Sequence, residues 1–138
     1  MTKELSVYLH GIGSEDSKIV IKALEPYCIT PLHFCSSKEK LSDVDIENNG
    51  NTSLLVDVDA IGDLEDAVDE LITFRKKYPN VVVVMISAFV LSDEFGTYRQ
   101  LICDATLRSP VSQGRVKSGL TAAILNKMHS MPSIITAA

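Results

Sequence analysis

Six apolar residues follow one another at Val81-Val82-Val83-Val84-Met85-Ile86 in this 138-residue chain. Five of the six are β-branched, which favours a strand that is buried on both faces. The run is far too short to span a bilayer. A strand with two buried faces belongs in the centre of a parallel sheet with helices on either side, so this segment predicts an α/β fold.

Strand and helix patterns alternate along the rest of the chain. We expect further strands at residues 5–9, 29–35, 53–58 and 105–107. We expect helices at about 14–24, 38–46, 63–77, 92–102 and 116–128. Five such units joined by short loops predict a doubly wound, five-stranded parallel sheet of flavodoxin-like order 2-1-3-4-5 with five helices. Residues 1–130 then form one domain, and residues 131–138 form a C-terminal tail.

The five expected helices differ in the strength of their signals. The third has one apolar stripe, formed by Leu64, Ala67, Val68, Leu71 and Ile72, with Asp63 as its N-cap. For the first helix, Ser14 or Asp16 is the expected cap. The segments at 38–46 and 92–102 are the short, weakly patterned ones.

Composition limits the classes of function. The formal charge of −5 argues against a nucleic-acid-binding surface. The three cysteines stand at no metal-ligand spacing, which suggests reduced thiols in a cytoplasmic protein. The N-terminus has no secretory signal pattern, and we expect no membrane association.

Polar side chains follow three of the expected strands at the point where each strand ends. They are Asp57, Ser87 and Ser109. Because the carboxyl ends of parallel strands meet at one edge of the sheet, we expect these three side chains to share a site.

With these residues in view, the chain resembles a response-regulator receiver domain, the CheY-like phosphoacceptor module of two-component signalling. Leu54-Leu55-Val56-Asp57, followed by Gly62, resembles the phosphoacceptor strand and its loop. Val84-Met85-Ile86-Ser87-Ala88 resembles the strand that ends in the switch Ser/Thr-Ala, and Ser109-Pro110 stands where the family has Lys-Pro. The resemblance implies that Asp57 is the phosphoacceptor and Ser87 the switch residue.

The chain departs from the family pattern at four positions. Gly11 and Ile12 replace the two acidic residues that hold Mg²⁺, Ser109 replaces the lysine, and Thr106 replaces the aromatic switch residue. Phosphoryl transfer to a carboxylate depends on compensating charge, which these replacements remove. We therefore expect an inactive pair at Asp57 and Ser87, no metal or other cofactor, and no enzymatic activity.

The leading interpretation is a degenerate receiver, or pseudo-receiver, that acts through protein contacts independently of phosphorylation. The resemblance implies that it binds a signalling partner or a second copy of itself through the fourth helix, fifth strand and fifth helix. On that face we expect six residues: Phe95, Tyr98, Arg99, Arg108, Lys117 and Leu120.

Two alternatives stay open. The first is a single-domain response regulator that is still phosphorylated on Asp57 in a phosphorelay and uses Mg²⁺. The second is a sensor that holds an anion or small ligand in the Gly11–Ser14 loop at the first helix N-terminus.

Overall fold

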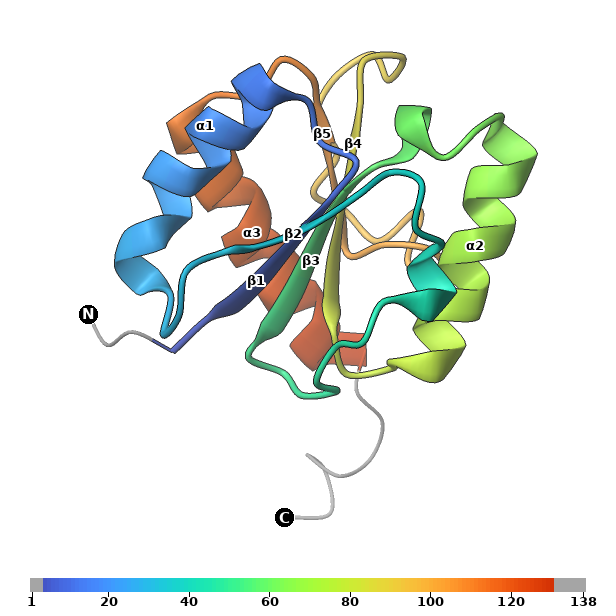
Figure 1. Cartoon of the computed structure of the whole chain (residues 1–138), viewed down its shortest axis with the longest axis horizontal. Helices are drawn as coiled ribbons and strands as arrows, with labels where there is room; N and C mark the ends of the chain where they lie inside the picture. Colours follow the sequence, from blue (N-terminus) through green and yellow to red (C-terminus); the bar gives the residue numbers. More distant parts are fainter. Residues whose placement is uncertain (1–3, 131–138) are drawn as a thin grey trace.

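A computed structural model describes residues 4–130, so the expected tail at 131–138 lies outside the described residues. Five parallel strands form one sheet of order β2-β1-β3-β4-β5, as the sequence predicts (Figure 1). Their bounds are β1 Ser6–His10, β2 His33–Cys35, β3 Thr52–Asp57, β4 Val82–Ser87 and β5 Ala105–Arg108. Every residue of β4 is buried, which confirms the central strand.

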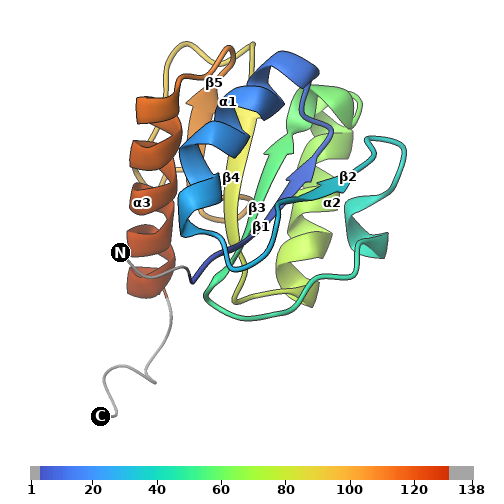
Figure 2. The same ribbon diagram turned by 60° about the vertical axis from the view of Figure 1, so that its left-hand side comes forward.

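Helices cover both faces of this sheet. Helices α1 (Ser14–Leu24) and α3 (Gln113–Ser130) lie side by side on one face, and α2 (Leu64–Lys77) lies on the other (Figure 2). Alternate strand residues supply the two cores, because successive side chains of a strand point to opposite faces. Leu55 and Val84 pack with α1 and α3, whereas Leu54 and Val83 pack with α2. No helix within residues 4–130 is long and apolar enough to cross a membrane.

The expected helix at 38–46 is wrong, because only a short 3-10 turn, η2 (Leu41–Asp43), forms there. The backbone of this segment instead forms hydrogen bonds with the hydroxyl of Tyr78, which donates to the carbonyl of Val44 at 2.8 Å and accepts from the amide of Ile46. Leu41, Val44 and Ile46 are all buried, and their spacing along the chain does not match one face of a helix. Burial of these three side chains against α2 favours an irregular segment.

The expected helix at 92–102 is also wrong, so the described residues contain three α-helices where five were expected. Glu94 exchanges two backbone hydrogen bonds with Thr106, at 2.8 and 2.9 Å, in an antiparallel bridge beside β5. Asp93 accepts hydrogen bonds from the Arg115 guanidinium and from the amide of Arg108. Gly96 is a poor helix former in the middle of this segment. These tertiary bonds, together with weak helix propensity, hold the segment in an irregular path.

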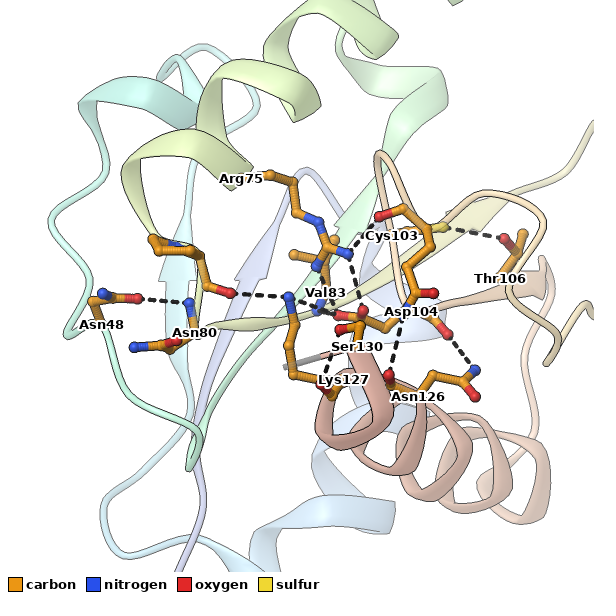
Figure 3. Close-up of polar contacts among 12 residues, drawn as sticks. Asn48, Arg75, Asn80, Val83, Cys103, Asp104, Thr106, Asn126, Lys127 and Ser130 are labelled. Atoms are coloured by element: carbon orange, nitrogen blue, oxygen red, sulfur yellow. Dashed lines mark hydrogen bonds and ion pairs between the residues drawn. The ribbon is translucent and has the colours of Figure 1, made fainter. Parts of the chain in front are cut away.

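A buried ionic network anchors the far end of that segment at the amino edge of the sheet (Figure 3). The carboxylate of Asp104 accepts two hydrogen bonds from Arg75, at 2.7 and 2.9 Å, and a third from the amide of Val83. Lys127 lies 3.8 Å from the same carboxylate. Asn126 donates to the carbonyls of Phe95 and Asp104. The network thus joins α2, α3 and the β4–β5 connection.

We predict that Asp104→Ala lowers the free energy of unfolding by about 3 kcal/mol or more, because it leaves two buried cations without a counter-charge. Asp93→Ala is the control, since its partner Arg115 is partly exposed, and it should cost about 1 kcal/mol or less. Urea denaturation measures both values. Equal losses in the two variants would contradict a special role for Asp104.

Helix α3 approaches β5 closely at Gly119. A Cβ at this position would lie 2.9 Å from a methyl group of Leu107, whereas a Cβ at Gly114 meets nothing within 4 Å. We predict that Gly119→Ala destabilises the fold by about 1–3 kcal/mol through overpacking. Gly114→Ala should stabilise it by up to about 1 kcal/mol, because alanine is the better helix former. A stabilising Gly119→Ala, measured by thermal denaturation, would show that the contact with Leu107 relaxes freely.

Candidate functional site

The candidate site lies at the carboxyl edge of the sheet, where β3 ends at Asp57. The Asp57 side chain is half-buried, and its Oδ1 accepts a hydrogen bond from the amide of Asp59 at 2.9 Å. This bond caps the short 3-10 turn η3 (Val58–Ala60) that follows the strand. The carboxylate is therefore held by its own loop.

The surroundings of Asp57 are electronegative. Burial, followed by the charges of Asp59 and Asp16, raises the pKa of the Asp57 carboxyl above its ordinary value. The hydrogen bond that the backbone amide of Asp59 donates to Asp57 partly opposes this increase. No cation is among the groups that shift this pKa. The three ion pairs found within residues 4–130 are Arg75–Asp104, Arg115–Asp93 and Lys127–Asp104, and none involves Asp57.

Ser87 does not face Asp57, although both stand at strand ends. In the register of β3 with β4, Asp57 pairs with Ile86, so Ser87 is one residue further on and points to the opposite face of the sheet. There the Ser87 hydroxyl donates to Oδ1 of Asp59 at 2.7 Å, and the amide of Ala88 donates to Oδ2 at 2.8 Å. Asp59, which the sequence analysis did not select, is thus the partner of the expected switch residue.

Ser109 is bound by the carboxylate of Asp16, a residue that was expected to cap α1. Its hydroxyl donates to Oδ2 of Asp16 at 2.6 Å, and the amide of Val111 donates to Oδ1 at 3.1 Å. The expected capping of α1 by Ser14 or Asp16 is therefore wrong. The N-cap is Gly13, without a side-chain bond, and Asp16 is buried against the loop after β5.

Gly11, directly after β1, is a strained and crowded position for any side chain. Its φ of +69° is in the left-handed region that favours glycine. A Cβ there would lie 3.1 Å from Cβ of Ala60 and 3.4 Å from Cβ of Ser37. Ile12 is half-buried and packs against the core shared with α1 and α3.

These residues do not fit the Mg²⁺ site that the receiver fold implies. Magnesium requires near-octahedral oxygen ligands that include carboxylates. Within residues 4–130 no group of three or more histidine, cysteine, aspartate or glutamate side chains has a geometry that could hold a metal ion. Both oxygens of Asp16 and both oxygens of Asp59 already accept hydrogen bonds from the protein.

Thr106, which the resemblance places at the aromatic switch position, is fully buried in β5. Its hydroxyl lies 3.6 Å from the Cys103 sulfur, while its backbone bonds Glu94. Its side chain therefore has no route to solvent at this site.

The six residues expected to form one interaction face differ in exposure and in the clefts that they line. Tyr98 and Arg99 are exposed on the β4–β5 connection, and Arg99 lines a cleft on the α2 side of the sheet. Lys117 is exposed on α3 beside Tyr27, on the α1 side.

Two of the remaining residues of that set are part of the core. Leu120 is only 4% exposed, so its place on the expected face is wrong. Phe95 is half-buried and packs against the core of α1 and α3. Arg108 is exposed, and its guanidinium donates to the carbonyl of Leu91 at 3.0 Å, away from Asp57.

Comparison with known proteins identifies the fold. No protein-family model matches this sequence, and no curated protein matches it either. Among solved structures, the chain is similar to a response regulator from Thermotoga maritima, with 16% identity, a TM-score of 0.52, and coverage of 85% of this chain and 98% of that one. It is also similar to a CheY-like response regulator receiver domain from Methanospirillum hungatei, with 13% identity, a TM-score of 0.54, and coverage of 92% and 99%.

A third similar structure is the signal receiver domain of an HD domain-containing protein from Pseudomonas fluorescens, with 11% identity, a TM-score of 0.55, and coverage of 94% and 93%. These three neighbours are response regulators or their receiver domains, and the resemblance expected from the sequence is confirmed for the fold.

We predict that Asp57→Asn stabilises the protein at neutral pH. When folding raises the pKa of a carboxyl, the folded state loses stability as the pH rises from the unfolded pKa, about 3.9, through the folded pKa. Asparagine keeps the oxygen that accepts from Asp59 but carries no charge. The advantage of the variant should therefore be largest at neutral pH and vanish below about pH 3.9.

Urea denaturation across the pH range tests this prediction. Asp69→Asn, which removes an exposed carboxylate from α2, is the matched control and should show no such trend. If Asp57→Asn is less stable than the native chain at pH 7, a cation stabilises Asp57 and the electronegative description is wrong.

Proposed function

We propose that this chain is a degenerate receiver domain that signals through noncovalent protein contacts and not through phosphorylation of Asp57. One observation carries the proposal: the hydroxyls of Ser87 and Ser109 donate hydrogen bonds to carboxylates other than that of Asp57. In the receiver resemblance, these are the positions whose side chains would meet a phosphoryl group.

The electrostatics of the edge support the same conclusion. Phosphoryl transfer to Asp57 would bring an anion towards three carboxylates, those of Asp57, Asp59 and Asp16. The charges of Asp59 and Asp16 already disfavour the ionised state of Asp57. Catalysis of this step depends on positioned cations that neutralise the developing charge. Gly11 and Ser109 supply none. We accordingly propose that the domain has no enzymatic activity and no metal cofactor.

The proposed partner is another protein of a two-component type pathway in the cytoplasm. The formal charge of −5 does not favour nucleic acid. Tyr98 and Arg99 remain candidates for contact, because both side chains are exposed and both residue types are common interface anchors.

An amide NMR titration of the full chain tests the proposal. We expect that Mg²⁺ followed by beryllofluoride, a phosphoryl mimic, leaves the resonances of Asp57, Ser87 and Ser109 unchanged, since no compensating cation is available. An authentic receiver domain treated in parallel is the positive control. Shifts centred on Asp57 would instead support the alternative, a single-domain response regulator phosphorylated in a phosphorelay.

The anion-sensor alternative finds no support in the geometry of residues 11–14. Gly11 lies against Ala60 and Ser37, and five of the surface clefts on the described chain are lined by other residues.

A further inference from the structure

A cleft of about 630 Å³ opens between the first turn of α2 and the chain that follows β4. Its floor is apolar and consists of Val58, Ala67 and Met85, which are all buried in the α2 core. The cleft is on the α2 side of the sheet, and Asp59 and Ser87 stand at its end nearest the candidate site. The volume falls within the range typical of binding clefts in proteins.

The rim of this cleft consists of large apolar side chains that are nearly bare. Leu64 is 77% exposed, Phe89 is 87% exposed and Leu91 is 93% exposed. Single exposed apolar residues are ordinary, but several around one hollow mark an interaction surface.

The origin of the cleft is the irregular β4–β5 connection. Leu64 begins the apolar stripe of α2, yet it has no covering element, because residues 92–102 form no helix beside it. The cleft therefore lies where α2 presents apolar surface that this chain leaves uncovered.

Charge on the rim indicates what the cleft can bind. Asp59 and Asp63 line it, and Glu65 and Asp66 follow in the same first turn of α2. Among residues 4–130 none of these four carboxylates takes part in an ion pair, and Arg99 is the one basic residue that lines the cleft. The rim is thus negative around an apolar floor.

We propose that this cleft binds an amphipathic α-helix of a partner protein, with its apolar stripe on the floor and its lysine or arginine residues beside Asp59 and Asp63. Recognition of this kind uses anchors at i, i+3, i+4 and i+7 on one helix face. The inference rests on the proposed function, because it names the partner chemistry of a domain that acts through noncovalent contacts.

The chain's own tail fits the cleft less well. Residues 131–138 contain no lysine or arginine to match the acidic rim. They also follow Ser130 near the amino edge of the sheet, where Lys127 donates to the carbonyl of Pro79, whereas the cleft lies at the carboxyl edge.

The test uses the full chain and a synthetic helical peptide with leucines at i, i+3, i+4 and i+7 and lysines on both flanks. A second peptide has the same leucines and glutamate in place of each lysine. We expect the lysine peptide to shift the amide resonances of Leu64 and residues 89–91, and to bind at least about tenfold more tightly than the glutamate peptide. Added salt should weaken its binding.

Four variants locate the binding surface. Leu91→Ser removes an exposed rim anchor, and Asp63→Asn removes a charge while keeping the N-cap oxygen that Asp66 requires. Leu91→Ser should weaken binding of the lysine peptide by about tenfold or more, and Asp63→Asn by about threefold to fivefold. Leu125→Ser on α3 and Asp69→Asn on α2, both outside the cleft, should change the affinity by less than about twofold.

Three results would overturn the inference: equal binding of both peptides, loss of binding in the control variants, or no binding at all. Concentration-dependent self-association that Leu91→Ser abolishes would assign the cleft to a second copy. Contacts from residues 131–138 to Leu91 in the free chain would assign it to the tail.

The same measurements separate this inference from the proposed function. Beryllofluoride shifts at Asp57 with intact peptide binding would overturn the proposed function alone. No beryllofluoride shift at Asp57, together with no peptide binding, would overturn this inference alone.

Discussion

The buried carboxylate of Asp104 controls how the second half of the sheet is assembled. Its backbone amide donates to the carbonyl of Val83, and its side chain accepts from the Val83 amide, so Asp104 satisfies both backbone groups of this β4 residue. Its charge also requires cations, and Arg75 and Lys127 bring α2 and α3 to it. Because Arg75 donates at the same time to the carbonyl of Gln100, the ion pair also fixes the chain between β4 and β5.

That constraint explains why the β4–β5 connection is irregular and why the cleft exists. The connection is tied at Gln100 and Asp104 by Arg75, at Phe95 by Asn126, and at Asp93 by Arg115. These bonds hold the connection close to β5 and the end of α3. The first turn of α2 is left without a helical neighbour, and Leu64 remains exposed.

Much of this fold follows from patterns along the chain, and the failures have a common physical cause. The unbroken apolar run of β4 and the stripe and cap of α2 depend on burial and local hydrogen bonds, so they could be predicted from neighbouring residues. The segments at 38–46 and 92–102 are held by the distant partners Tyr78, Arg115 and Asn126, and tertiary bonds of this kind override weak helix propensity. The loss of compensating charge at Ser109 could be read from the sequence. The pairing of Ser109 with Asp16 could not, because these residues are far apart in the chain.

The candidate site and the cleft share one residue, Asp59. Its backbone amide holds Asp57, its carboxylate holds Ser87 and Ala88, and it lines the cleft beside Phe89. The Ser87 hydroxyl is bound to Asp59, so a basic partner residue in the proposed cleft would act on Ser87 directly and not through Asp57. A basic partner residue in the cleft would also reduce the repulsion that Asp59 exerts on Asp57, which couples occupancy of the cleft to ionisation of Asp57 by the reciprocity of linked equilibria.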